Sequence, residues 1–316
     1  MAAALDVSAD AARAPEPVRL VAVLGPTASG KSALGLELAR RVGGEIVCCD
    51  SQQVYVGMDI GTAKPTAEER REIPHHLLDV ARPDETFQAA RWAALARAAI
   101  HDVAARGRVP IVVGGTGLYY RALTAGLFEA PPPDPAIRAR HRALAEAAGV
   151  EALHDRLAAV DADAAGKINR RDLVRISRAL EVFEQTGAPI SALRRSAAPP
   201  ADLAPRALVL DPPLAELRAR IAARARAMFA SGFEEEVRAL HAAGYGPALR
   251  PLQALGYAQM GAFLEGRCTR QEALEATIAA TVAYARRQRT WFRKEPGAAR
   301  FEAAPSAAAL AEELAR

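Results

Sequence analysis

The chain has 316 residues, 51% of them hydrophobic and 25% charged, with a formal net charge of +4. This composition is ordinary for a folded protein, and no apolar run reaches the roughly 18 residues that suggest a membrane span. The three cysteines have no C-x-x-C spacing, which argues against a zinc site and a disulfide framework. We expect a cytoplasmic protein without membrane contact. Residues 1–17 lack the pattern of a signal peptide, and we expect a disordered leader there.

Strand and helix patterns alternate in the first third of the chain. Short apolar runs predict strands at residues 19–24, 45–49 and 109–113. Apolar residues at helical spacing predict helices at 32–42 and 86–106. Alternation of this kind favours a parallel α/β sheet with helices on both faces, in which ligands bind at the carboxyl ends of the strands.

A long segment rich in glycine and proline, VGMDIGTAKPTAEERREIPHHLLD, separates two of these elements. Irregular segments of this length are usually functional or mobile. His75 and His76 lie in it, but no third histidine or cysteine is close in sequence. We therefore expect these two side chains to be packed or to order the loop, rather than to bind a metal.

The middle of the chain changes character after the tract APPPDP. The helical pattern that follows predicts an inserted all-helical domain over residues 130–200, with a short strand at 207–210 returning to the sheet. The remainder is helical to residue 294 and ends in an Ala-rich, acidic stretch. We expect the α/β core to comprise residues 18–129 and 201–316.

The stretch GPTASGKS matches the phosphate-binding pattern G-x-x-x-x-G-K-[ST], with a strand before it and a helix after it. Such a turn presents backbone N–H groups to an anion, and the helix dipole adds to the attraction. Lys31 is expected to reach the terminal phosphate and the Ser32 hydroxyl to bind Mg²⁺. The expected diphosphate-binding residues are Gly25, Pro26, Thr27, Ala28, Ser29, Gly30, Lys31 and Ser32.

The loop alone leaves the reaction open. In ATPases an apolar strand typically ends in an acid that holds Mg²⁺, but the run VPIVV ends in Gly114, Gly115 and Thr116. We find an acid at a strand end only at Asp50, a position typical of kinases that act on small molecules. This pattern favours group transfer to an acceptor over hydrolysis, although Asp50 in a purely structural turn or cap remains an alternative.

Several longer motifs occur in a distinctive order, namely DSQQVYVGMDIGTAKP, PHHLLD, VVGGTGLYYRAL, INRRDLVRISRALEVFEQTG and RRQRTWFRK. With them the chain resembles the tRNA dimethylallyltransferase (tRNA isopentenyltransferase) family over residues 20–294. The bacterial members, which have no C-terminal zinc finger, are the more similar. The resemblance implies a P-loop NTPase-like parallel sheet flanked by helices, with an inserted helical domain.

The resemblance also implies a reaction. The family transfers a dimethylallyl group from dimethylallyl diphosphate to N6 of the adenosine 3′-adjacent to the anticodon, in tRNAs reading codons that begin with U. Diphosphate is released and Mg²⁺ is needed. Asp50 would be the base, Thr116 would touch the target nucleotide, and Arg238 would lie near the diphosphate. We expect a monomer that binds the anticodon stem-loop.

The basic run RRQRTWFRK suits contact with an RNA backbone, and Arg286, Arg289 and Arg293 would share one helix face. A solvated basic face is the alternative. Against the family pattern, Ala258 stands where a basic residue usually follows the tyrosine. By resemblance, the expected tRNA-binding residues are Asp50, Ser51, Gln52, Gln53, Thr116, Arg138, Val174, Arg175, Ile176, Ser177, Arg178, Gln253, Gly256, Tyr257, Arg286, Arg287, Gln288, Arg289, Thr290, Trp291, Phe292 and Arg293.

Three other functions are compatible with parts of this pattern. A small-molecule kinase would use Asp50 as acceptor base and would not need the basic aromatic helix. An isopentenyltransferase acting on free adenine nucleotides would have the same phosphate loop, but such enzymes usually lack the helical insertion. A non-enzymatic RNA-binding module would have no use for the phosphate loop.

Overall fold

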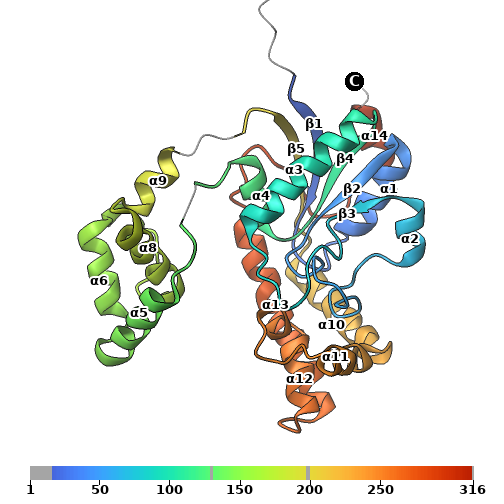
Figure 1. Ribbon diagram of the computed structural model, residues 1–316. Coiled ribbons are helices and arrows are strands. Elements are labelled where there is room, and N and C mark those ends of the chain that lie inside the picture. Colours follow the sequence, from blue (N-terminus) through green and yellow to red (C-terminus); the bar gives the residue numbers. More distant parts are fainter. Residues whose placement is uncertain (1–15, 129–130, 197–199, 315–316) are drawn as a thin grey trace, which may run out of the picture. The chain divides into compact units, whose positions relative to one another are not determined.

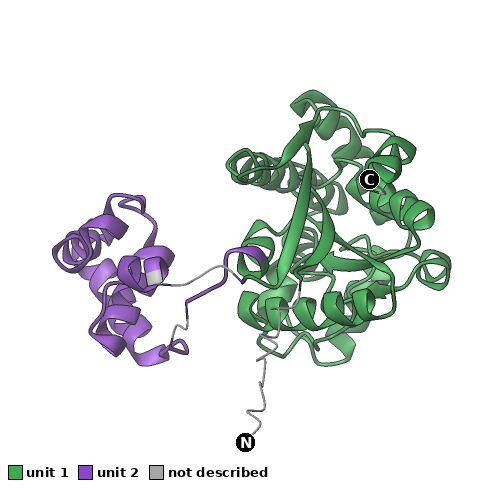
Figure 2. Ribbon diagram, turned by 90° about the horizontal axis from the view of Figure 1, so that it is seen from above, with its two compact units in different colours: residues 1–123, 201–316 green, residues 124–200 purple. Residues whose placement is uncertain are grey.

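A computed structural model describes residues 16–128, 131–196 and 200–314 of the chain. It contains two compact units, unit 1 with residues 1–123 and 201–316 and unit 2 with residues 124–200 (Figure 2). Unit 2 begins a few residues earlier than the start at residue 130 expected from the sequence. Most of the expected leader, residues 1–15, lies outside the described residues.

Unit 1 is built on a parallel sheet in the order β3-β2-β4-β1-β5-β6 (Figure 1). The strands are β1 (Val18–Leu24), β2 (Gly44–Cys49), β3 (His75–His76), β4 (Val109–Gly114), β5 (Leu203–Leu210) and β6 (Ala299–Phe301). The four strands that the sequence predicts are confirmed. Strands β3 and β6 were not predicted, because two or three residues are too few to show a period of two.

Side chains alternate across the sheet and feed two separate cores. In β1, Leu20, Ala22 and Leu24 belong to one buried cluster, whereas Val21 and Val23 belong to the other. Helices α1 (Lys31–Val42) and α14 (Ala307–Leu314) cover the second face, and α3 (Ala89–Ala105) and α4 (Gly117–Thr124) contribute to the first. The predicted layering with helices on both faces is therefore confirmed.

The sequence suggested that the long segment after β2 is irregular. The structure shows that part of it is regular. It holds α2 (Ala67–Glu72), which begins with a capping box between Thr66 and Glu69. It also holds β3, whose His75 pairs with Ile46 in β2. The His75 and His76 rings bond to the Ile73 carbonyl and the Glu45 carboxylate, at 2.7 Å each.

The C-terminal helices of unit 1 gather beyond the carboxyl ends of the strands (Figure 1). They are α10 (Leu214–Ala230), α11 (Phe233–Ala242), the 3-10 turn η1 (Arg250–Gln253), α12 (Tyr257–Leu264) and α13 (Arg270–Phe292). Helix α13 packs along α10 and α12. The phosphate loop and the end of β4 are thereby covered by helices from the other end of the chain.

Unit 2 is helical (Figure 2). It has its own core, in which Leu153, Leu157, Ile176 and Leu180 are buried. Its helices are α5 (Pro135–Ala148), α6 (Val150–Val160), α7 (Ala162–Ala165), α8 (Leu173–Thr186) and α9 (Ile190–Ser196). Asp161 joins two of them, because its carboxylate accepts hydrogen bonds from the backbone N–H groups of Ala164 and Ser191.

Candidate active site

The phosphate loop runs from the end of β1 into α1 and has the shape of an anion cradle. Gly25 has φ 150°, and a Cβ there would lie 2.4 Å from the carbonyl oxygen of Leu210. Gly30 caps α1 with φ 92°. At residue 25 only glycine tolerates both the positive φ and the close Leu210 carbonyl, and this allows β5 to approach the loop closely. The Lys31 ammonium donates to the Pro26 carbonyl at 3.2 Å, which holds the side chain over the loop.

The electrostatics of the loop favour an anion. Burial lowers the pKa of Lys31 to about 8, although the nearby Asp50 carboxylate opposes this shift. Arg224 also lowers it. A diphosphate in the loop would bring negative charge to Lys31 and Arg224 and so restore the ammonium form.

Arg224, on α10, was missed from the sequence. Its guanidinium donates to Thr27 Oγ1 at 2.5 Å, and Arg220, one turn earlier, donates to the Ala28 carbonyl at 3.4 Å. The spacing of four residues places both on one helix face. In a helix with as many alanines and arginines as α10, however, that spacing is equally typical of a solvated surface.

Asp50 directly follows β2 and Thr116 lies two residues after β4, and the structure brings these two turns together. Asp50 Oδ1 accepts the backbone N–H of Gln52 at 2.8 Å, and the Thr116 hydroxyl accepts that of Ser51 at 3.0 Å. No described residue donates a hydrogen bond to Asp50 Oδ2. One carboxylate oxygen therefore orders the turn, and the other remains available to a ligand.

A cavity of about 250 Å³ opens between this turn and the C-terminal helices. Thr27, Asp50 and Arg224 give it a polar end. The other part of its wall is largely apolar, with Ile221, Ala225, Met228, Leu255 and Tyr257 among the lining residues. A site with a charged end at a phosphate loop and an apolar interior fits a small amphiphilic anion.

Gln288 connects the phosphate loop to the turn after β4. Its amide oxygen accepts the Thr27 N–H at 2.8 Å, and its amide nitrogen donates to the Gly115 carbonyl at 2.8 Å. The side chain is 7% exposed. Both ends of this predicted RNA contact are therefore already bonded within unit 1.

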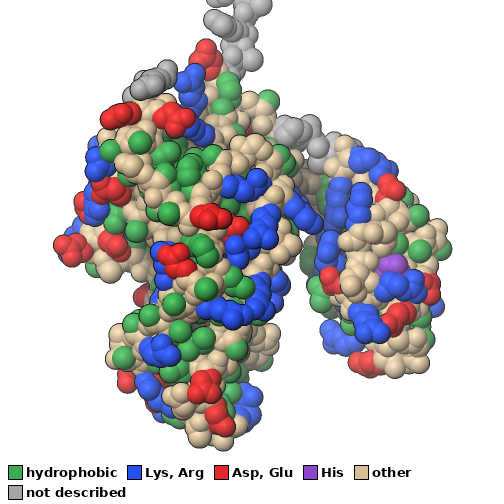
Figure 3. All heavy atoms as spheres, turned by 180° about the vertical axis from the view of Figure 1, so that it is seen from behind, with side chains coloured by type: hydrophobic (Ala, Val, Ile, Leu, Met, Phe, Trp, Pro, Cys, Tyr) green, Lys and Arg blue, Asp and Glu red, His purple; other side chains and the backbone are tan. Residues whose placement is uncertain are grey.

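Some of the other residues in the run RRQRTWFRK are exposed, whereas others pack against residues of the same chain. Arg286, Arg287 and Thr290 are exposed, and Figure 3 shows basic side chains gathered on one face of unit 1. The Trp291 ring lies 4.4 Å below the Arg121 guanidinium. Phe292 is 1% exposed, so its side chain belongs to the core rather than to a ligand surface.

From the sequence, Asp50 was the only acid found at the end of a strand. That interpretation was wrong, because Asp211 is a second one. It directly follows β5, forms an ion pair with Arg289 and accepts from Arg293 Nε at 3.2 Å. The end of this strand was predicted at residue 210, but the acid that follows it was not considered. Two of the arginines expected to face RNA are thus partly neutralised by this carboxylate.

In unit 2, Glu181 holds two of the predicted RNA-binding arginines. Its buried carboxylate accepts from Arg138 Nε at 2.9 Å and from Arg178 Nη1 at 2.5 Å. Burial alone would raise the pKa of Glu181, but the two guanidinium groups outweigh it and hold that pKa below its ordinary value. The arginine pair is therefore fixed in place before any ligand binds.

The neighbouring positions of α8 face opposite ways. Val174 is 79% exposed and Arg175 is also exposed, whereas Ile176 and Ser177 are buried. The Ser177 hydroxyl lies 2.9 Å from His141 Nδ1. The side chains of Ile176 and Ser177 consequently offer a ligand no surface.

The remaining predicted positions lie on α11 and around α12. Gln253 is exposed, whereas Gly256 and Tyr257 are buried. Arg238 is exposed and donates to Glu234 at 2.8 Å, and it does not line the cavity. The structure therefore brings Tyr257 to the cavity with Thr27 and Asp50, but not Arg238.

Across residues 16–128, 131–196 and 200–314, no helix is long and apolar enough to cross a membrane. The same residues contain no cluster of three or more His, Cys, Asp or Glu side chains that could hold a metal ion. Cys48, Cys49 and Cys268 are free thiols, as expected.

Comparisons with known proteins agree with this geometry. Residues 53–295 match the family model described as IPP transferase. The tRNA dimethylallyltransferase of Anaeromyxobacter sp. (strain K) is 54% identical, over 89% of this chain and 92% of the relative.

Two solved structures are also similar. A tRNA isopentenylpyrophosphate transferase from Bacillus halodurans has 36% identity and a TM-score of 0.66, and 94% of each chain is covered. A eukaryotic dimethylallyltransferase acting on tRNA has 26% identity and a TM-score of 0.69, covering 87% of this chain and 69% of that one. With its phosphate loop and Asp50 at one cavity, and with these matches, the chain belongs to the tRNA dimethylallyltransferase family.

Proposed function

We propose that this protein transfers a dimethylallyl group from dimethylallyl diphosphate to N6 of the adenosine 3′-adjacent to the anticodon in tRNAs reading codons that begin with U. The observation that carries the proposal is the shared cavity. Thr27 of the phosphate loop, the Asp50 carboxylate and a largely apolar wall all line it. The phosphate loop would bind the diphosphate leaving group, Asp50 would contact the acceptor amine, and the apolar wall would contact the isoprenoid chain.

In the proposed reaction, the N6 lone pair attacks C1 of the dimethylallyl group and forms the new C–N bond. The C1–O bond breaks, and its electron pair leaves with diphosphate. The exocyclic amine is a weak nucleophile because its lone pair is delocalised into the ring. Asp50 Oδ2 accepts the proton that N6 loses, which makes Asp50 the general base.

The phosphate loop stabilises the charge that grows on the leaving diphosphate. The backbone N–H groups at the start of α1, the Lys31 ammonium and the Arg224 guanidinium supply this stabilisation, whereas the Thr27 N–H is already bonded to Gln288. These groups are held in place by the fold before the reaction begins, so little reorganisation accompanies bond breaking. In this reaction the loop binds the diphosphate leaving group, whereas in a kinase it would bind the nucleotide that donates the phosphoryl group.

We propose Mg²⁺ as the cofactor, held by Ser32 and by oxygens of the diphosphate. Ser32 is exposed at the first turn of α1, directly after Lys31. Mg²⁺ usually keeps several waters and takes only one or two protein ligands beside substrate phosphates, so this sparse donor set fits it. When bound, the ion would neutralise charge on the diphosphate.

We propose that tRNA binds over the exposed arginines of both units, and that the target adenosine is flipped out of its stack into the cavity. Flipping a base costs a few kcal/mol, and an anticodon loop lowers this cost because it is single-stranded. Arg286 and Arg287 on α13, and Arg175 on α8, are exposed for phosphate contact. The free thiols suit a reducing cytoplasm, where we place the reaction.

The test is an assay with dimethylallyl diphosphate, Mg²⁺ and unmodified tRNA. Mass spectrometry of the digested tRNA should show C5H8 added to a single adenosine beside the anticodon. Modification of free AMP alone would instead support an enzyme of adenine nucleotides. Transfer of the γ-phosphate from ATP would support a kinase, and either result would refute the proposal.

A further inference from the structure

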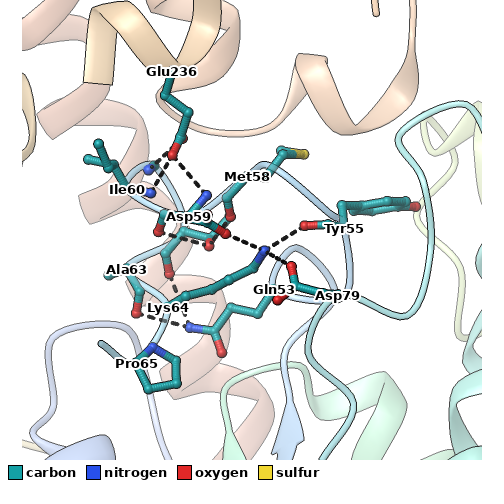
Figure 4. Close-up of polar contacts among 12 residues, drawn as sticks. Gln53, Tyr55, Met58, Asp59, Ile60, Ala63, Lys64, Pro65, Asp79 and Glu236 are labelled. Carbon is teal, nitrogen blue, oxygen red and sulfur yellow. Dashed lines mark hydrogen bonds and ion pairs between the residues drawn. The ribbon is translucent and has the colours of Figure 1, made fainter. Parts of the chain in front are cut away.

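A single carboxylate bonds to two segments that line the cavity, residues 59–61 and Tyr257. Glu236, on α11, accepts the backbone N–H groups of Asp59 at 2.9 Å, Ile60 at 2.6 Å and Gly61 at 3.1 Å (Figure 4). The Tyr257 hydroxyl donates to the same carboxylate at 2.6 Å. Gly61 and Tyr257 both line the cavity, where the Gly61 backbone lies directly against the Tyr257 ring.

The segment that Glu236 holds is also fixed from its other side. The Lys64 ammonium, whose side chain is 1% exposed, donates to the Tyr55 carbonyl at 2.6 Å and pairs with Asp59 at 2.6 Å and Asp79 at 2.5 Å (Figure 4). Gln53 donates to the carbonyls of residues 62 and 63, at 3.1 Å each. Residues 59–64 are therefore held within the segment that follows β2, while Glu236 supplies bonds that connect them to α11 and Tyr257.

The Gly61 backbone is packed too tightly against its neighbours to admit a side chain. A Cβ at this residue would lie 2.4 Å from the Phe233 ring and 2.5 Å from the Tyr257 ring. The backbone of the loop is thus pressed against the aromatic side of the cavity. A small outward movement of residues 59–62 would widen the cavity directly at Tyr257.

We propose that Glu236 is a positioning residue that sets the width of the apolar cavity and thereby selects a five-carbon allylic diphosphate over longer ones. This inference rests on the proposed function. Glu236 does not touch the substrate; it acts by holding the Gly61 backbone against Tyr257. When this carboxylate is lost, the loop can withdraw and leave space for further methylene groups.

The test uses Glu236→Gln, which keeps the shape of the side chain. In the wild type, Oε1 accepts from Gly61 and Tyr257 and Oε2 accepts from Asp59 and Ile60. A glutamine amide would present an NH₂ group to one of these donor pairs. The carboxylate's hydrogen bonds to that pair are then lost. Glu235→Gln, at the next and exposed residue of α11, is the matched control.

The readout is the ratio of two dissociation constants measured by calorimetry, that of geranyl diphosphate divided by that of dimethylallyl diphosphate. We expect Glu236→Gln to lower this ratio roughly tenfold, whereas Glu235→Gln leaves it at the wild-type value. A variant that was only destabilised would reduce the fraction of binding-competent protein and leave the ratio unchanged. An unchanged ratio in Glu236→Gln would overturn the inference.

If Glu236→Gln does not fold, Tyr257→Phe removes one of the four hydrogen bonds to the carboxylate and should lower the ratio by a smaller factor. An unchanged ratio in that variant would count equally against the inference. Failure of the proposed function is distinguishable. It would appear as wild-type protein that binds neither diphosphate or that adds no C5H8 to tRNA.

Discussion

At the scale of single residues, Lys31 shows how function and stability oppose each other. Burial lowers its pKa to about 8 from the value of 10.5 expected in an unfolded chain. Between these values the folded protein binds fewer protons than the unfolded one, so the charged form of Lys31 opposes folding at neutral pH. An anion in the phosphate loop removes this penalty, because it stabilises the ammonium.

Lys31→Met should therefore raise the free energy of unfolding at pH 7 while weakening the binding of inorganic diphosphate about a hundredfold. The gain in stability over the wild type should shrink as the pH rises from 8 towards 10.5, because wild-type Lys31 is then losing its charge. Urea unfolding at both ends of this range measures the difference. A variant less stable than the wild type at pH 7 would contradict this account.

At the scale of elements, Gln288 ties the last long helix to the first loop. Its side chain bonds Thr27, which lies 261 positions earlier in the chain, and also Gly115. Gln288→Ala should leave these two backbone groups without partners and cost about 2 kcal/mol in the free energy of unfolding. We also expect kcat/KM to fall about tenfold, because the phosphate loop loses its support.

The same variant tests the expectation, based on resemblance, that Gln288 contacts tRNA. Since both ends of its amide are bonded within unit 1, the dissociation constant for tRNA should stay within about twofold of the wild-type value. A filter-binding titration measures it. A large loss of tRNA affinity together with unchanged stability would support RNA contact instead.

At the scale of the whole molecule, exposed arginines should govern tRNA affinity through salt. Arg286 and Arg287 are exposed, whereas Arg289 is paired with Asp211. Arg286→Gln or Arg287→Gln should each lower the slope of log Kd against log salt concentration by about 0.7 for each lost phosphate contact. Arg267→Gln, at an exposed arginine paired with Glu265, changes the charge equally and should leave the slope unaltered.

Much of this architecture can be predicted from local sequence. The phosphate loop, four strands and the acid after β2 follow from patterns within about ten residues, since periodicity and turn chemistry act over that range. What escaped prediction depends on distant partners. Arg224 matters because it meets Thr27, 197 residues away, and Glu236 because it caps the N–H of Ile60, 176 residues away.

Other errors have local causes. Asp211 was overlooked although the strand before it was predicted to end at residue 210, and β3 is too short to show alternation. Ile176 and Phe292 lie in motifs that suggested RNA contact, yet both are buried. A motif shows which residues occur together in a family, whereas the side of the helix on which each one lies is decided by packing.

The central claim is that Asp50 receives the proton of the acceptor amine in a cavity that it shares with the phosphate loop. The most direct measurement is the single-turnover rate of Asp50→Ala with dimethylallyl diphosphate and tRNA, paired with its dissociation constants for both substrates. We predict a rate at least about a hundredfold lower, with tRNA affinity largely retained. A variant with wild-type rate, or one that has lost tRNA binding in proportion to its rate, would show that Asp50 only orders its turn.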